Sequence, residues 1–218
     1  LFFPGGDIGS LSVHGTINDV VMSGEKPTYL AASFILEEGF PLSDLKRIVG
    51  SMAKAAQDAQ VLIVTGDTKV VERGSGDGVF ITTTGVGMVP EGIHVSSNKA
   101  QPGDKILISG TLGDHGIAIM LLRENLSFHC TLESDTASLH DLVASMVTAI
   151  PNIHVLRDTT RGGAATALNE IAHQSSVGMM LYEKKLPILE PVNAACEFLG
   201  LDPLYVANEG KLIAICTA

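Results

Sequence analysis

Four polar segments interrupt apolar stretches of this sequence and hold its best candidates for chemistry. They are Asn18-Asp19, GDTK at 66–69, RDTTRGG at 157–163 and NEGK at 208–211. An ionised carboxylate is costly to remove from water without a cation or several hydrogen bonds, so the aspartates in these segments need partners. We therefore look for a binding site among them.

Magnesium is the natural common partner of Asp19, Asp67 and Asp158. This ion prefers hard oxygen ligands, takes one or two protein carboxylates and completes its shell with water and nucleotide phosphate. The His and Cys residues form no clustered ligand set, which makes zinc a poorer match. The pattern predicts a site for Mg-ATP.

The segment at 157–163 also suits an anion. Gly162 and Gly163 stand at the start of a predicted helix, where free N–H groups face a phosphate, and Arg161 can donate to the same oxygens.

An alternative interpretation gives this segment a purely structural role. Thr159 or Thr160 would then cap the helix, while Arg157 and Asp158 would form a surface pair. Glycines at a helix start are too modest a signal to separate the two interpretations.

Lys69 and Glu209 are the candidates for charge neutralisation and proton transfer. Lys69 lies two positions after Asp67 at a predicted strand end, where it can neutralise phosphate or, with its pKa lowered by burial, exchange a proton. Taken alone, GDTK is more typical of a simple turn, and NEGK of a hairpin turn with an exposed Glu209. His115 is predicted to be satisfied locally at a helix start.

Missing motifs exclude several common sites. The sequence contains no G-x-x-x-x-G-K-S/T, no G-x-G-x-x-G and no G-x-S-x-G, and GSGDG at 74–78 precedes a strand and is a turn. A formal charge of −10 argues against nucleic acid or anionic lipid as a partner. No apolar run approaches the roughly 18 residues of a membrane span.

The elements that must position these segments form two successive sets. Apolar spacing and turn residues predict, in the first half, a helix within 9–24, a strand over 28–39, a helix capped by Ser43, a short buried strand over 61–66 and a strand over 79–89. After a Pro-Gly turn they predict a strand over 105–110, helices over 114–125 and 138–150, a strand over 153–158, a helix from Gly162 or Gly163, a helix ending at Gly200 and two strands within 204–216. We place a domain boundary near residue 99.

The composition is that of a globular protein, with 45% hydrophobic and 17% charged residues and 23 glycines among 218 residues. Cys130, Cys196 and Cys216 lie far apart, so we expect reduced, buried cysteines in a cytosolic protein. The start at Leu1 and the apolar end LIAICTA lead us to expect truncation at both ends.

In this order and context the polar segments resemble the HypE family of hydrogenase maturation proteins, in the PurM-like (aminoimidazole ribonucleotide synthetase-like) superfamily. The resemblance runs along the whole chain. It is carried by FFPGGDIG, HGTINDVVMSG, FILEEG, VTGDTKVVERG, SGTLGDHG, LRDTTRGG and FLGLDPLYVANEGKLI. GDTKVV combined with TRGG and NEGK distinguishes it from thiamine-phosphate kinases and selenide dikinases.

The resemblance implies a two-domain PurM-like fold that combines an α/β and an α+β part. Residues 1–98 would form an N-terminal ATP-binding domain, lacking its start, that dimerises through its mixed sheet. Residues 99–218 would form a C-terminal α+β sandwich lacking its end. The nucleotide would lie in a cleft between the two domains.

The resemblance also implies a reaction. Members of the family use ATP to dehydrate a thiocarboxamide on their own C-terminal cysteine to a thiocyanate, which supplies the cyanide ligands of nickel–iron hydrogenase. We therefore expect ATP and Mg2+ as cofactors, a cytoplasmic homodimer, and the carbamoyltransferase HypF and the HypC and HypD pair as partners. Neither nucleic acid nor a membrane is expected.

The resemblance assigns roles to individual residues. Asp19 and Asp67 would hold magnesium and ATP phosphates, Lys69 would neutralise the oxygen that accepts the phosphoryl group, and Glu209 would remove the amide proton. The remaining nucleotide contacts are assigned to Asn18, Thr68, Asp158, Arg161, Gly162 and Gly163.

Two departures from the family pattern limit these expectations. The chain stops before the family's terminal cysteine and lacks its N-terminal glycine-rich segment, so we expect weak nucleotide binding without turnover on the chain itself. Two alternatives are another PurM-like ATP-dependent kinase or ligase, and a non-catalytic dimeric scaffold.

Overall fold

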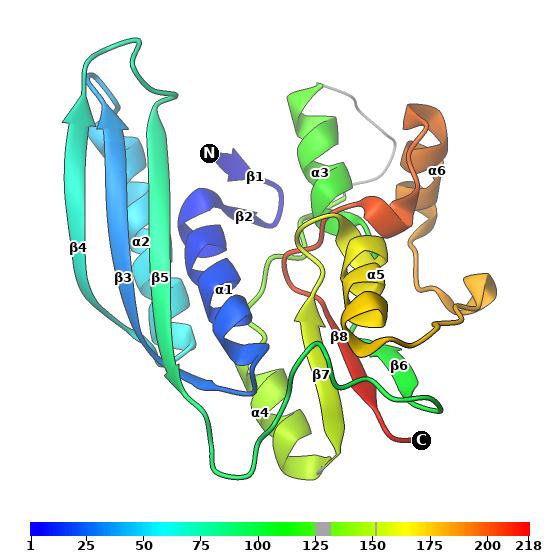
Figure 1. The fold of residues 1–218 in the computed structure, drawn as a ribbon. Coiled ribbons are helices and arrows are strands. Elements are labelled where there is room, and N and C mark those ends of the chain that lie inside the picture. Colours follow the sequence, from blue (N-terminus) through cyan, green and yellow to red (C-terminus); the bar gives the residue numbers. More distant parts are fainter. Residues whose placement is uncertain (125–131, 151) are drawn as a thin grey trace.

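A computed structural model describes residues 1–124, 132–150 and 152–218, and the first half of the chain is built around a mixed sheet (Figure 1). Its elements are β1 (Phe2–Phe3), β2 (Gly6–Asp7), α1 (Ile8–Val21), β3 (Lys26–Glu37), α2 (Leu42–Asp58), β4 (Leu62–Val71) and β5 (Val79–Met88). In the order β4-β3-β5, β3 runs parallel to β4 and antiparallel to β5. Helices α1 and α2 lie on one face of this sheet.

Helix α1 ends before Gly24 as its sequence predicts, and it begins at Ile8, one residue before the predicted segment. Asp7 caps it by accepting hydrogen bonds from the N–H groups of Gly9 and Ser10, and the turn after it contains Gly24 with a φ of 75°. The helix packs tightly on β5, because a Cβ atom at Gly85 would lie 2.7 Å from Val20.

Two predictions about the next elements are wrong. Helix α2 starts one residue before Ser43, and the main-chain oxygen of Pro41 accepts from Asp44 and Leu45 in place of a side-chain cap. Strand β4 is neither short nor buried. It continues through GDTK because its parallel pairing with β3 extends to Val71, and it is exposed because it forms the sheet edge.

The second half forms an antiparallel sheet in the order β6-β8-β7, with helices around it (Figure 1). Its elements are β6 (Lys105–Ile108), α3 (Asp114–Arg123), α4 (His140–Ala149), β7 (Ile153–Asp158), α5 (Gly163–Ser175), η1 (Glu183–Lys185), α6 (Glu190–Leu199), η2 (Pro203–Tyr205) and β8 (Leu212–Cys216). The mixed first half and the antiparallel second half confirm the predicted fold class.

The predicted pair of strands within 204–216 is wrong in its first member. Residues Pro203–Tyr205 form the short helix η2, begun by a hydrogen bond from the Leu204 N–H to the Asp202 carboxylate. The segment that follows is not a hairpin turn, because Asp135 binds the main-chain N–H groups of Glu209 and Gly210. Only β8 is a strand, and it lies in the middle of its sheet.

The largest hydrophobic cluster crosses from one half of the chain to the other. Ile17 of α1 and Ile48 of α2 belong to the same buried cluster as Val143 of α4 and Leu156 of β7. Helix α1 therefore has apolar partners on both sides. Cys196 and Cys216 are free and buried as predicted, while Cys130 lies outside the described residues.

Candidate active site

Asn18 ties helix α1 to the second half of the chain. Its side chain is buried, its Nδ2 atom donates to the main-chain oxygens of Ala137 and Glu209, both at 2.9 Å, and its Oδ1 atom accepts from the Leu139 N–H at 2.8 Å. Both amide hydrogens are thus used within the protein. In this arrangement Asn18 has no donor left for a nucleotide, and it holds the segment that carries Glu209.

The next residue, Asp19, faces charged residues from the second half. Partial desolvation raises its pKa, and the nearby Asp158 carboxylate raises it further, while Arg161 and Arg157 oppose the shift. Asp19 belongs to α1, Asp158 ends β7 and Arg161 lies in the connection to α5. Two of the predicted carboxylates therefore come close in space, although 139 positions separate them in the sequence.

Glu209 is the most strongly perturbed acid of this cluster. Its side chain is only 12% exposed, and burial, followed by the charges of Asp135, Asp158 and Asp19, raises its pKa to about 7. A Cβ atom at Gly15 would lie 4.0 Å from the Glu209 Oε2 atom, so the carboxyl lies beside α1. The expectation of an exposed turn glutamate is wrong.

His115 lies on the other side of this carboxyl. Its Nε2 atom is 3.9 Å from Glu209 Oε1, and its Nδ1 atom is 2.7 Å from the Ser134 hydroxyl. Because burial lowers the pKa of His115, the ring is neutral at pH 7 and the contact with Glu209 is not a full ion pair. Sequence reasoning missed this contact, although the apolar neighbours of GDHG signalled a buried position.

The connection at 157–163 differs from its predicted structural interpretation, while its predicted role as an anion site stays a prediction. The N-cap of α5 is Gly162, and neither Thr159 nor Thr160 caps it. Arg157 pairs with Glu170 at 2.8 Å rather than with Asp158.

Packing within the protein requires a glycine at position 163. A Cβ atom there would lie 2.3 Å from the Leu204 carbonyl oxygen, and its φ is 62°. Close packing against η2 therefore explains this glycine without a phosphate.

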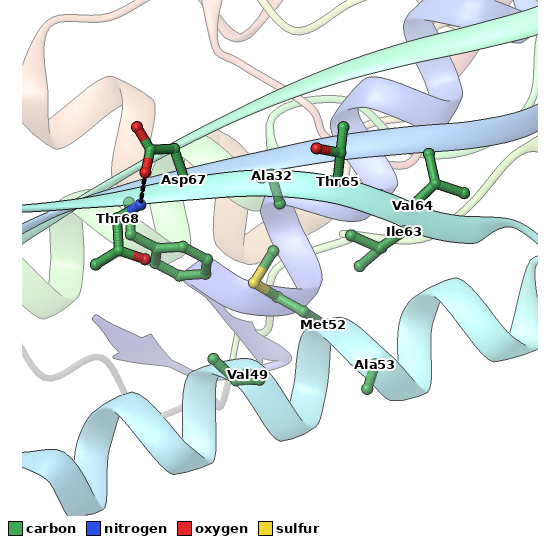
Figure 2. Close-up of a pocket in the computed structure, with 11 residues that line it drawn as sticks. Ala32, Val49, Met52, Ala53, Ile63, Val64, Thr65, Asp67 and Thr68 are labelled. Atoms are coloured by element: carbon green, nitrogen blue, oxygen red, sulfur yellow. Dashed lines mark hydrogen bonds between the residues drawn. The ribbon is translucent and has the colours of Figure 1, made fainter.

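Asp67, Thr68 and Lys69 lie apart from this cluster, on edge strand β4. Asp67 pairs with Ser33 and Lys69 with Ile35, so both point to the sheet face that α1 and α2 leave uncovered. Thr68 points to the helical side, into an apolar groove between β4 and α2. Figure 2 shows this groove and the hydrogen bond from the Thr68 N–H to the Asp67 carboxylate. The groove is lined by apolar groups such as Met52, and the Asp67 carboxylate points away from it.

A single chain therefore brings together Asp19, Asp158, Arg161 and Glu209, but not Asp67 or Lys69. Within the described ranges, no three His, Cys, Asp or Glu side chains converge as a ligand set. The donor chemistry still fits magnesium, because a divalent ion would relieve the repulsion between Asp19 and Asp158 and needs only one or two carboxylates. None of the helices in the described part of the chain has the length and hydrophobicity needed to cross a bilayer.

Both halves of the chain match known domains. Residues 1–89 match the N-terminal domain of AIR synthase related proteins, and residues 101–218 match the C-terminal domain. The carbamoyl dehydratase HypE of Cupriavidus necator is 70% identical over 218 residues, which are the whole chain and 62% of that relative. The HypE chain in a crystal structure of a HypE–HypF complex is 56% identical with a TM-score of 0.98, covering all of this chain and 71% of that one. The chain belongs to the HypE family.

A second HypE-family structure bears on the ligand. HypE crystallised in complex with ATP is 56% identical, with a TM-score of 0.97, and the match covers 99% of this chain and 64% of that one. The chain spans 62–64% of the length of three curated relatives that it matches. The predicted boundary at residue 99 remains a prediction.

Proposed function

We propose that this chain forms the nucleotide-binding and catalytic part of an ATP-dependent carbamoyl dehydratase. The carrying observation is the Glu209 carboxyl, which is buried beside Asp19 and Asp158 and has a pKa of about 7. An acid with such a pKa can accept a proton at neutral pH and release it again. Family membership and the relative crystallised with ATP support the choice of ATP as co-substrate.

The proposed reaction has two chemical steps. The oxygen of a cysteine-bound thiocarboxamide accepts the γ-phosphoryl group of ATP, ADP leaves, and the nitrogen loses the first of its two protons. Glu209 then takes a proton from the nitrogen of the phosphorylated amide, the carbon–oxygen bond breaks and phosphate departs, leaving a thiocyanate. One water is removed in total, and its atoms end in phosphate and a released proton.

We assign the binding roles by position. Asp19 would hold magnesium, which supplies charge neutralisation for the phosphates, and Asp158, Arg161 and the α5 start would lie along the phosphate chain. Arg161 is exposed and free to turn toward an anion. Asn18 instead serves the fold of the site.

Asp67 and Lys69 require a second copy of the chain in this proposal. Both lie on the uncovered sheet face, on the far side of the sheet from α1, so the partner's β4 would supply them to a shared site. The uncovered face supports dimerisation because it exposes large apolar side chains. These are Tyr29, Ile35, Phe80, Val86 and Met88.

HypF is the proposed donor of the carbamoyl group, since a relative 56% identical was crystallised in complex with HypF. The HypC and HypD pair and a cytoplasmic location rest on the family resemblance alone and remain predictions.

The test uses the full-length gene product with HypF, carbamoyl phosphate, ATP and magnesium, followed by mass spectrometry of its cysteines. We expect a thiocyanate adduct in the wild type, and accumulation of the thiocarboxamide in Glu209→Gln with a rate lower by a factor on the order of 100. Dehydration at the wild-type rate in Glu209→Gln would refute the assignment.

Mixing two inactive variants tests the shared site. If Lys69→Ala and Glu209→Gln chains pair at random, about half of the dimers are mixed and each has one intact site, giving about a quarter of wild-type turnover. If both residues act within one chain, the mixture stays inactive. The control is the Lys69→Ala variant alone, in which no dimer has an intact site.

A further inference from the structure

The segment that carries Glu209 is held by hydrogen bonds on both sides. Asn18 donates to the Glu209 carbonyl oxygen at 2.9 Å, while Asp135 Oδ1 accepts from the Glu209 N–H at 3.1 Å and Asp135 Oδ2 from the Gly210 N–H at 3.4 Å. A Cβ atom at Gly210 would lie 2.0 Å from the Asp135 carbonyl oxygen, so the two segments are in direct contact.

Asp135 is itself fixed by its surroundings. Its side chain is only 3% exposed, and Lys211 places its ammonium group 3.4 Å from the carboxylate. The neighbouring Ser134 donates its N–H to the Pro4 carbonyl oxygen, and its hydroxyl lies within hydrogen-bond distance of both His115 and the Thr136 N–H. A buried carboxylate with this many partners has little freedom to move.

The same arrangement sets the direction of the Glu209 side chain. With its main chain held by Asn18 and Asp135, the Glu209 carboxyl lies between Gly15 of α1 and the His115 ring. We propose that Asp135 is a positioning residue, which fixes the Glu209 carboxyl at this place between the two halves of the chain. The role of Glu209 in the reaction rests on the proposed function, whereas the placement of Glu209 by Asp135 does not.

The charged residues around Glu209 give the proposal a consequence that can be measured. Asp135, Asp158 and Asp19 oppose its ionisation, Arg161 favours it, and the neighbouring His115 is neutral at pH 7. Lys211 is engaged with Asp135. After burial itself, Asp135 is the largest contributor to the raised pKa of Glu209. Replacing Asp135 should therefore lower the pKa of Glu209, a change that a loss of stability alone would not cause.

The experiment compares Asp135→Asn and Asp135→Ala with Asp104→Asn. Asp104 is a matched control, because its side chain is 8% exposed and also binds a turn N–H and a neighbouring side chain. Carboxyl carbon NMR follows the titration of Glu209 in this chain, assigned by its absence in Glu209→Gln. Turnover and the KM for ATP are measured on the full-length gene product.

We expect the Glu209 titration to move to lower pH in Asp135→Asn and to stay unchanged in Asp104→Asn. Asp135→Asn keeps an acceptor for the Glu209 N–H and should retain turnover within about threefold, with the acidic limb of its pH profile moved to lower pH. Asp135→Ala should lose kcat by a factor on the order of 100, the effect of a misplacement of about 1 Å, with little change in the KM for ATP.

An unchanged Glu209 titration in Asp135→Asn, together with wild-type kcat in Asp135→Ala, would overturn the proposal. If Asp135→Ala does not fold, the titration of Asp135→Asn decides alone. If Glu209→Gln turns over normally, the proposed function fails, while a Glu209 titration that differs between Asp135→Ala and Asp135→Asn, which are both uncharged, still decides whether Asp135 positions Glu209.

Discussion

At the scale of single residues, the main feature of the candidate site is that its acidic side chains are only partly neutralised within one chain. Glu209, Asp19, Asp158 and Asp135 are four acids, opposed by Arg161, which acts on Asp19 and Glu209, by Arg157, which acts on Asp19, and by Lys211, which pairs with Asp135. Such an excess of negative charge is costly unless protons or cations bind. The unfavourable charge is consistent with a site that gains stability when magnesium and nucleotide arrive.

The raised pKa of Glu209 predicts a pH-dependent stability. Its pKa is about 7 in the folded protein against an ordinary value of 4.5, so the folded state binds more protons between these values. Stability from this group is fully present below pH 4.5 and is lost as the pH rises to 7, by about 3 kcal/mol in total. Urea unfolding of the wild type and Glu209→Gln should show the difference growing across this window. An equal difference at pH 5 and pH 8 would contradict the prediction.

Asp67 gives a prediction about nucleotide binding. In calorimetric titrations with ATP and magnesium, Asp67→Asn should bind at least about tenfold more weakly than the wild type, since one charged contact of roughly 1.5 kcal/mol is removed. Asp77→Asn, in the turn before β5, is the control and should bind normally. Equal binding by Asp67→Asn would exclude Asp67 from the nucleotide site.

Residue types in the sequence predict many of the residues that belong to the candidate site, but they do not predict how these residues are arranged. Asp19, Asp158 and Glu209 stand out because ionisable groups rarely interrupt apolar stretches without a purpose. The roles of Asn18, Asp135 and His115 depend on contacts between residues 74 to 191 positions apart, such as Asp135 with Glu209 and Asn18 with Glu209. Local patterns contain no information on such pairs.

At the scale of elements, the start of α5 is fixed by packing against η2. Gly163→Ala should destabilise the protein by more than about 2 kcal/mol, because the residue has a left-handed φ and the new Cβ would meet the Leu204 carbonyl oxygen. Gly178→Ala is a suitable control, since no atom lies within 4 Å of its Cβ position, and should change stability by less than about 0.5 kcal/mol. Thermal unfolding measures both. Equal melting temperatures would contradict the packing explanation.

The elements were predicted well where periodicity was strong and poorly where tertiary contacts decide. Helices α1 and α2 and strand β5 follow their apolar spacing and turn glycines. Strand β4 extends through a polar segment because β3 offers a pairing edge up to Glu37. Residues Pro203–Tyr205 resemble a strand in composition, yet Asp202 and Pro203 favour a helical turn.

At the scale of the whole molecule, the uncovered sheet face predicts the oligomeric state. Val86→Lys should convert a dimer into a monomer, because Val86 is 59% exposed in the isolated chain and a buried ammonium at an interface is costly. Leu42→Lys, at a site 78% exposed at the start of α2, should leave the dimer intact. Light scattering after gel filtration measures the mass. A monomeric wild type would remove the basis for a shared site.

The buried side chain of Asn18 also constrains the order of events during synthesis. Its partners Ala137, Leu139 and Glu209 lie 119, 121 and 191 positions later in the chain, so a nascent chain exposes this amide to water until almost the whole of the described sequence has left the ribosome. We expect the Glu209 carboxyl to reach its place only in the last stage of folding, after contacts of high sequence separation have closed. Pulsed hydrogen exchange during refolding should therefore protect the Leu139 and Glu209 amides after those of α1, and simultaneous protection would contradict this order.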